Sequence, residues 1–480
     1  MPLILPGNVA SATADAGYSV ANSCRFNNDD SAYMHRTPAG GGTSNTTFTW
    51  SIWIKRTDTA TAIGRLFEFY NTSSYYVSLR FRDDVAHNLE FYSESNGAGV
   101  NLRTNRQFRD VGAWYHIVMR VDTTNGTDDD RLRMYVNGVQ ETSFVARTNP
   151  GSSEDLDFNG ASDVQYVGRK WEDSDYFDGY MAEVCYCDGQ SLAPTSFGEF
   201  DSASPTIWKP KDVSGLTFGT NGFYLDFKDS ANLGNDANGG TDLTEVNLDA
   251  TDQATDTPTN NFCILNAISS ISRPTLKQGN CSLSNNASDG HRVHGTIASK
   301  TGYFEVKLGV DTIGASGKGI WWGVMDATNN AEPSYNVTTF RCMKTNYGYN
   351  THFSTANFGA GNTWEDVTTG LDSDIGDILM CAWKNGKVYF GYNGTWFFSA
   401  DPSNDTDGST QIPLVDSNAY QLPVAKSDLD GLDDSDFNFG GCPAFAISSG
   451  NADANGYGNF EYAPPTGCYA LCTKNLAEFG

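Results

Sequence analysis

Residues 301–306 read Thr-Gly-Tyr-Phe-Glu-Val, residues 386–390 read Gly-Lys-Val-Tyr-Phe, and residues 438–441 read Asn-Phe-Gly-Gly. Apolar and aromatic side chains recur in these segments at the two-residue period of a β-strand, and glycines mark the turns. Short strands and tight turns of this kind build a β-sandwich, a fold whose loops recognise partners. The segments contain no catalytic constellation, so they indicate binding rather than chemistry.

The length and composition predict two domains of the all-β class. A chain of 480 residues is about three times the length of a typical single domain. Its 49 glycines, its aromatic content of 13% and its many Asn, Asp, Ser and Thr clusters favour short strands with numerous turns. We therefore expect two antiparallel β-sandwich domains of the jelly-roll type, joined by a loop-rich connector.

The formal charge of −27, from 58 acidic and 31 basic residues, would repel nucleic acid and anionic lipid. No nucleic-acid partner is therefore expected. Residues 1–6 lack the basic region of a secretion signal and contain two prolines. No later segment approaches the ~18 to 20 apolar residues that a membrane span needs, so membrane insertion is not expected either.

The ten cysteines are predicted to be buried free thiols, because they form a small share of a long chain with ample core-forming residues. Cys185 and Cys187 have the spacing that places both side chains on one face of a strand, and Cys381 lies in an apolar run. No pair has the Cys-x-x-Cys spacing of a zinc or redox site, so a thiolate metal site is not predicted.

Residues 20–200 have the pattern of one sandwich. Residues 48–54 alternate as Phe-Thr-Trp-Ser-Ile-Trp-Ile, and residues 114–122 and 131–138 form a predicted hairpin around an acidic turn. These residues resemble the laminin-G-like branch of the concanavalin-A-like lectin/glucanase superfamily. The resemblance rests on the Trp50/Trp53 strand, Trp114-Tyr-His-Ile, Tyr135-Val-Asn-Gly and Phe177-Asp-Gly-Tyr-Met-Ala-Glu-Val-Cys-Tyr.

Residues 201–263 are rich in Pro, Gly, Asp, Asn and Thr and contain few apolar runs. We interpret them as a connector with one or two strands. Asp226, Asp229 and Asp236 in this segment could hold Ca²⁺, although the spacing and terminal Glu of an EF-hand are absent. Turns stabilised by Asx hydrogen bonds are the alternative interpretation of these residues. No other cofactor is expected.

Residues 264–480 read as a second sandwich and resemble a SPRY (B30.2-like) domain. The matching motifs are Gly302-Tyr-Phe-Glu-Val, Trp322-Gly-Val, Gly376-Asp-Ile, Asn385-Gly-Lys-Val-Tyr-Phe, Asn393-Gly-Thr-Trp and Asn438-Phe-Gly-Gly-Cys-Pro-Ala-Phe. Residues 401–436 form a long acidic insertion that animal versions lack, so no animal binding specificity carries over. Trp321 and Trp322 are neighbours in one strand and must face opposite sides of it.

The whole arrangement, with an extended N-terminal arm at residues 1–19, is similar to virion proteins of tailed bacteriophages. The resemblance implies an exposed fibre, knob or decoration that assembles in the host cytoplasm and stays on the particle surface. It also implies other virion proteins as partners, a homo-oligomer with a trimer favoured, and attachment to host surface polysaccharide. A purely structural virion component and a glycoside hydrolase are the alternatives.

Sugar-binding sites combine an aromatic ring for stacking with polar side chains that fix hydroxyl groups. Loop residues with this combination occur in both halves of the chain, and each ring could instead cap a core or fill a subunit contact. The candidates are Trp171, Asp173, Asp175 and Tyr176 in the first half and Trp364, Asp366, Asn393 and Trp396 in the second.

We expect no enzymatic activity, because the strand-borne Glu-x-Asp-x-Glu of concanavalin-like glucanases is absent. Glu183 stands alone within an apolar strand. His116 is interpreted as a strand residue, and the histidines do not form a metal pair or a Ser-His-Asp arrangement.

Overall fold

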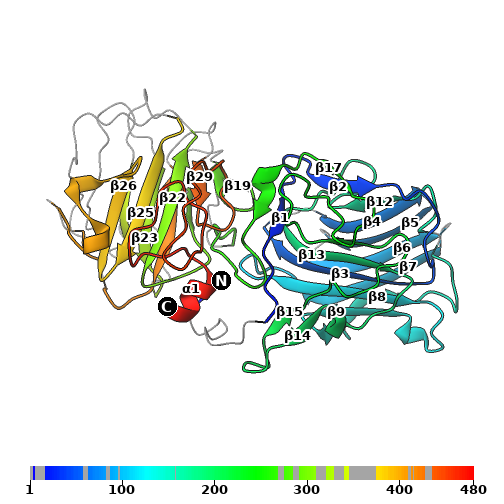
Figure 1. The fold of residues 1–480 in the computed structure, drawn as a ribbon. Helices are drawn as coiled ribbons and strands as arrows, with labels where there is room; N and C mark the ends of the chain where they lie inside the picture. Colours follow the sequence, from blue (N-terminus) through cyan, green and yellow to red (C-terminus); the bar gives the residue numbers. More distant parts are fainter. Residues whose placement is uncertain are drawn as a thin grey trace. The chain divides into compact units, whose positions relative to one another are not determined.

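The computed structural model describes residues 4–5, 17–57, 63–82, 87–95, 98–156, 158–268, 275–284, 291–309, 320–328, 340–344, 375–408, 412–414, 416–427 and 435–479. The chain divides into two compact units (Figure 1). The first unit comprises residues 13–259, and the second comprises residues 1–12 and 260–480. Both units consist of antiparallel sheets, which confirms the all-β prediction.

The first unit contains two large antiparallel sheets. Its first sheet follows the order β10-β9-β8-β3-β13-β1-β18, and β16 also pairs with β13. The strands are β10 (Val139–Gln140), β9 (Leu132–Val136), β8 (Tyr115–Asp122), β3 (Thr47–Arg56), β13 (Gly179–Asp188), β1 (Ser23–Phe26), β18 (Gln253–Ala254) and β16 (Phe223–Leu225).

The second sheet of this unit follows the order β11-β7-β6-β5-β4-β12-β2-β17. Its strands are β11 (Phe144–Thr148), β7 (Ala98–Gln107), β6 (Asn88–Ser95), β5 (Tyr75–Phe81), β4 (Arg65–Thr72), β12 (Val164–Val167), β2 (Tyr33–Arg36) and β17 (Thr244–Val246). A separate hairpin joins β14 (Gly198–Phe200) to β15 (Trp208–Pro210).

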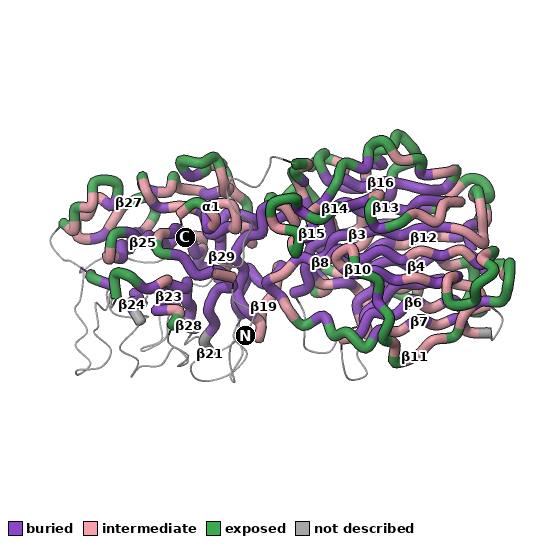
Figure 2. The backbone as a smooth tube through the Cα atoms, turned by 90° about the horizontal axis from the view of Figure 1, so that it is seen from below, coloured by how far each residue is buried: buried purple, intermediate pink, exposed green. Residues whose placement is uncertain are grey.

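The core of the first unit lies between the two large sheets, whose strands are largely buried (Figure 2). Trp50 of β3 stacks on Phe67 of β4, with ring centroids 4.9 Å apart and ring planes 10° from parallel. A row of cross-strand neighbours in the second sheet belongs to this core. The row consists of Met34, Val167, Phe67, Leu79, Phe91 and Leu102. Because side chains alternate along a strand, the residues beside them lie on the opposite face.

Residues 201–259, the greater part of the connector predicted at residues 201–263, lie within the first unit. They supply the strands β15, β16, β17 and β18. The segment is held by buried side chains, since Asp256 pairs with Lys55 at 2.7 Å and Trp208 donates to His116 at 2.9 Å. These contacts explain why a stretch with few apolar runs packs on the sandwich.

The second unit contains a seven-stranded sheet of order β19-β20-β29-β22-β25-β26-β27 and a four-stranded sheet of order β21-β28-β23-β24. The larger sheet consists of β19 (Thr275–Lys277), β20 (Ser282–Ser284), β29 (Ser435–Asn438), β22 (Gly302–Leu308), β25 (Ile378–Lys384), β26 (Lys387–Tyr392) and β27 (Thr395–Trp396). The smaller sheet consists of β21 (His291–His294), β28 (Gln421–Ser427), β23 (Ile320–Asp326) and β24 (Phe340–Lys344).

Two sequence predictions about side-chain placement are confirmed in these units. Trp322 belongs to the main core of the second unit and Trp321 to a separate cluster, as expected for neighbours on one strand. All ten cysteines are buried free thiols, and Cys185 and Cys187 share one cluster. The helix α1 (Thr473–Phe479) closes the chain, and none of the helices in the described residues is long and apolar enough to span a membrane.

Candidate functional site

The outer face of the second sheet carries a row of polar and aromatic side chains, directly beside the core row. Strand register makes consecutive members of this row cross-strand neighbours. The row consists of His35, Tyr166, Glu68, Ser78, Tyr92 and Asn101. Its rings are half-buried, so part of each remains accessible. Neighbouring strands lie about 4.8 Å apart, which gives the row an extent of more than one sugar ring.

Further aromatic rings gather around this row in three groups. Tyr33 lies 6.3 Å from both Tyr166 and Tyr176, measured between ring centroids. Tyr76 lies 5.9 Å from Tyr92 in the neighbouring strand. Tyr70 stacks on Trp171 at 4.4 Å. We call this surface the aromatic face, and it comprises Tyr33, His35, Glu68, Tyr70, Tyr76, Tyr92, Tyr166, Trp171 and Tyr176.

The loop of residues 169–178 brings together the four candidates that the sequence places in the first half. Trp171 stacks on Tyr70 with ring planes 17° from parallel. The Tyr176 hydroxyl donates to Asp173 at 3.2 Å. Asp175 accepts from Arg65 at 3.3 Å. Asp173 and Asp175 both have positive φ, at 58° and 55°, which is uncommon for residues other than glycine. The four residues therefore belong to one surface, the aromatic face and its rim.

A buried charge network holds this loop against β4. Glu68 is fully buried, accepts the backbone N–H of Trp171 at 2.8 Å and pairs with Arg65. Burial raises the pKa of Glu68, and the Arg65 guanidinium opposes that shift. Arg65 is itself buried and also reaches Asp175. The network thereby fixes the backbone of Trp171 against β4.

The strand-borne part of the aromatic face was not predicted from the sequence. The signal was present in residues 33–36 and 164–167, which read Tyr-Met-His-Arg and Val-Gln-Tyr-Val. In each, an aromatic residue alternates with a core residue at the period of a strand. These two segments lie far apart in the chain, and the sequence pattern does not specify that they pair or in which register.

The candidates of the second unit are placed differently. Asn393 occupies a turn with φ 46°, where its side chain accepts from the Ile378 N–H at 2.8 Å and donates to Asp377 at 2.7 Å. Trp396 is half-buried beside Tyr303, with 6.4 Å between ring centroids. The structure thus engages both in local packing. Trp364 and Asp366 lie outside the described residues.

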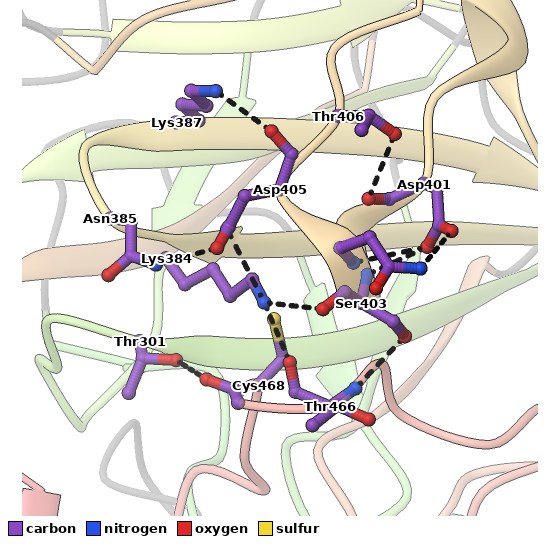
Figure 3. A network of polar contacts seen from close by, with 12 residues as sticks. Thr301, Lys384, Asn385, Lys387, Asp401, Ser403, Asp405, Thr406, Thr466 and Cys468 are labelled. Atoms are coloured by element: carbon purple, nitrogen blue, oxygen red, sulfur yellow. Dashed lines mark hydrogen bonds and ion pairs between the residues drawn. The ribbon is translucent and has the colours of Figure 1, made fainter.

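The start of the acidic insertion in the second unit is clamped by lysines (Figure 3). Lys384 is 7% exposed, and its Nζ donates to the carbonyl oxygens of Thr466 and Ser403 and pairs with Asp405. Lys387 donates to the carbonyl oxygen of Asp405 at 3.0 Å. These contacts tie the loop to β25 and β26, and we interpret them as structural.

The three calcium candidates each have partners within the chain. Asp226 accepts the N–H of Lys228 at 3.1 Å, and Asp229 accepts the N–H of Ala231 at 3.0 Å. Asp236 accepts the N–H groups of Tyr224 and Asn238. Among the described residues, no group of three or more His, Cys, Asp or Glu side chains is arranged to hold a metal ion. The contacts from Lys228, Ala231 and Asn238, each two residues after its Asp, are those of Asx-type turns.

His116 and Ser51 form a hydrogen-bonded pair, with 2.9 Å between Nε2 and Oγ. The other ring nitrogen, Nδ1, faces the Trp208 indole N–H at 2.9 Å. Because an indole N–H can only donate, Nδ1 must accept and Nε2 must carry the proton. Burial lowers the pKa of His116 to about 3. The ring therefore cannot take a proton from Ser51 as the base of a catalytic triad does.

Glu183 is buried at a bulge of β13 and has φ 50°. The hydroxyl groups of Tyr224 and Tyr18 donate to its carboxylate at 2.8 and 3.1 Å. Burial raises the pKa of Glu183 to about 7, while these hydrogen bonds and Lys228 oppose the shift. The negative charge of Asp226, which pairs with Lys228, also raises the pKa of Glu183.

We expect the stability of the first unit to depend on pH through Glu183. A carboxyl with a raised pKa in the folded state stabilises the fold below its ordinary pKa of 4.5 and loses that contribution as pH rises through about 7. Glu183→Gln cannot ionise, so its stability relative to the wild type should grow by about 1.4 kcal/mol per pH unit within this window. Urea unfolding at pH 5, 6, 7 and 8 measures the difference. A difference that stays constant with pH would contradict the assignment.

Comparison with known proteins bears on the first unit. Residues 27–189 match the family model described as the concanavalin A-like lectin/glucanases superfamily, in its laminin-G form. The first unit carries a laminin-G-like, concanavalin-A-like lectin domain. The aromatic face lies on the second sheet of this lectin-like domain. A search of curated proteins found no match.

Three solved structures illustrate the likeness. A heptameric SAP-like pentraxin from Limulus polyphemus is 14% identical, with a TM-score of 0.28 over 37% of this chain and 80% of its own. Domain 4 of a GH43 extracellular arabinanase from Geobacillus stearothermophilus, in complex with arabinotriose, is 18% identical, with a TM-score of 0.27 over 39% and 87%. Domains LG4-5 of the mouse laminin α1 chain are 10% identical, with a TM-score of 0.29 over 95% and 97%.

Proposed function

We propose that this protein binds glycans through the aromatic face of its lectin-like domain, without catalysing their hydrolysis. The observation that carries the proposal is the row of half-buried rings and polar groups on the outer face of the second sheet. Sugars present apolar C–H faces that stack on aromatic rings, and hydroxyl groups that bond to carboxylates and amides. The match of residues 27–189 to a lectin superfamily supports the same function.

Trp171 is the central contact in this proposal. Tyr70 supports the ring from one side at 4.4 Å, and Glu68 fixes the backbone of Trp171 through its N–H. The indole is therefore held in place, which reduces the entropy that binding costs. Asn101, which is half-buried, is a hydrogen-bonding group farther along the row, whereas Glu68 and Ser78 are fully buried and support the row from within.

We also propose that the protein is an exposed component of a tailed-phage virion, such as a fibre, knob or decoration. The order of a laminin-G-like half, a SPRY-like half and the C-terminal segment of residues 464–476, Pro-Pro-Thr-Gly-Cys-Tyr-Ala-Leu-Cys-Thr-Lys-Asn-Leu, supports this place on the particle. Assembly in the host cytoplasm, virion proteins as partners and host surface polysaccharide as the ligand belong to the same proposal. A symmetric oligomer, with a trimer favoured, would convert weak sugar contacts into useful avidity.

A purely structural role in the virion is the second candidate. Val139 in β10 and Val145 in β11 are 56% and 55% exposed, and both strands are at the edge of their sheets. Exposed edge strands with apolar side chains are surfaces on which another chain can pair. In this candidate the lectin-like domain contacts other virion proteins and no sugar.

Trp171→Ala should weaken glycan binding by about 10- to 100-fold, because a stacked aromatic anchor contributes about 1.4–2.8 kcal/mol. Tyr70→Ala should cause a smaller loss, since it removes only the support of the indole. The measurement is binding of the purified oligomer to whole cells and to extracted surface polysaccharide. Trp396→Ala tests the second unit in the same assay.

Phe200→Ala is the matched control for Trp171→Ala. Phe200 is 44% exposed and packs on Trp208 at 4.9 Å, away from the aromatic face, so its loss should leave binding unchanged. An unchanged unfolding transition of the first unit shows that each variant is folded. If the folded Trp171→Ala variant binds like the wild type, the aromatic face is not the site. If the intact wild-type oligomer binds nothing, the structural candidate replaces this one.

A further inference from the structure

In the ion pairs of the 169–178 loop, the acidic side chains are more exposed to solvent than the basic ones. Arg169 pairs with Asp173, and the two side chains are 9% and 75% exposed. Lys170 pairs with Glu172 at 24% and 47% exposure. Arg65 pairs with Asp175 at 2% and 21% exposure. In every pair the carboxylate is the more exposed member, so this edge of the aromatic face presents negative charge.

Arg169, one of the two cations of the loop, is covered by aromatic rings. The guanidinium carbon of Arg169 lies 3.8 Å from the ring centre of Tyr33 and 4.7 Å from that of Tyr166. Such stacking satisfies the charge without leaving it open to a ligand anion. The Arg169 Nε is buried and has no hydrogen-bond partner among the described residues.

Three rings of the face, those of His35, Tyr76 and Tyr92, are uncharged at neutral pH. Burial, together with the nearby Arg169 charge, lowers the pKa of His35, which keeps the imidazole neutral. Burial raises the pKa of Tyr92 to about 12 and raises the pKa of Tyr76, so both phenols keep their protons. Neutral rings with hydroxyl and imidazole groups suit a ligand rich in hydroxyl groups and without charge.

We propose that the aromatic face selects neutral, hydroxyl-rich glycans and excludes acidic ones, because the 169–178 loop presents carboxylates outward and holds its cations beneath them. This inference rests on the proposed function and names its ligand class. A sugar hydroxyl donates readily to Asp173 or Glu172, whereas a uronic acid or sulfate group would face like charge. The net charge of −27 also repels acidic glycans, at longer range.

The test uses polysaccharide pairs that share a backbone and differ in charge. Dextran is compared with dextran sulfate, and carboxyl-reduced polygalacturonate is compared with polygalacturonate. In at least one pair the neutral member should bind, and the charged member should bind at least about ten-fold more weakly because of like-charge repulsion. Binding of the neutral member should persist when salt rises from about 0.1 to 1 M, which shortens the screening length from about 10 to about 3 Å.

Two variants locate the selectivity. The double variant Glu172→Gln with Asp173→Asn keeps the shape of the loop and removes two of its outward charges. It should bind the charged polysaccharide of each pair more strongly, so the difference in affinity between the neutral and the charged member should become smaller. Asp129→Asn is the matched control, because Asp129 is also 75% exposed and paired with an arginine, Arg147. Asp129→Asn should leave the difference in affinity between the neutral and the charged polysaccharide unchanged.

The outcomes separate this inference from the function on which it rests. Binding of charged members that equals or exceeds that of the neutral members, and that weakens with salt, would overturn the selectivity and leave glycan binding intact. Binding of no member of any pair would overturn the proposed function and this inference together.

Discussion

Replacing Asp256 by Ala should lower the free energy of unfolding of the first unit by about 3–5 kcal/mol, the typical effect of removing one partner of a buried ion pair. Asp256 and Lys55 are both fully buried, and their charged atoms lie 2.7 Å apart. The second carboxylate oxygen accepts the Trp114 indole N–H at 3.0 Å. Without the carboxylate, the Lys55 ammonium stays in a dry interior and the indole N–H loses its acceptor.

Denaturant unfolding with probes for each unit measures this effect, because a chain with two units can unfold in two transitions. The transition of the first unit should move and that of the second should not. Lys55→Met with Asp256→Asn should recover most of the loss, since it removes both charges and keeps an acceptor for Trp114. Asp229→Ala, at an exposed turn, should change stability by less than about 1 kcal/mol. A small effect of Asp256→Ala would show that water reaches the pair.

Replacing Glu305 by Ala should lower the free energy of unfolding of the second unit by about 3–5 kcal/mol, because each buried donor that loses its acceptor costs about 1–3 kcal/mol. Glu305 is fully buried in β22 and accepts hydrogen bonds from the Tyr303 hydroxyl and the Asn438 amide. It also accepts the backbone N–H groups of Glu461 and Tyr462, at 3.0 and 2.8 Å. Burial raises the pKa of Glu305, and these donors oppose the shift.

The same substitution should release the segment around residues 461–462 from β22. Hydrogen exchange of the Glu461 and Tyr462 amides should accelerate by more than that of the core strands, since their acceptor is gone. Glu478→Ala is the control, because Glu478 is exposed on α1. It should leave both exchange and stability unchanged. Equal acceleration across the whole second unit would indicate global destabilisation and would contradict this local role.

Much of the local structure could be predicted from patterns within the chain. The alternation in residues 48–54 predicts β3, and the Asn-Gly turns at residues 137–138 and 385–386 end strands where the structure has them. The opposite placement of Trp321 and Trp322 follows from strand geometry alone. The grouping of Trp171, Asp173, Asp175 and Tyr176 in one loop was predictable because the residues are close in sequence.

The partners of these residues were not predictable, because they come from distant strands. Tyr70 supports Trp171 across 100 intervening residues of the chain, and His35, Tyr166 and Glu68 become neighbours only through strand register. For Asp226, Asp229 and Asp236 the composition left a calcium loop and Asx turns as alternatives, and the structure shows which backbone N–H groups these carboxylates accept.

Local patterning alone therefore specifies the class of this protein, its strands and turns, and the side of each strand that is buried. These features depend on the two-residue period of side chains and on the backbone preferences of glycine and asparagine, which act over a few residues. The aromatic face and the buried pairs of Asp256 and Glu305 depend on tertiary structure. Register between strands far apart in the chain places these side chains together, and that register is a property of the whole packed sheet.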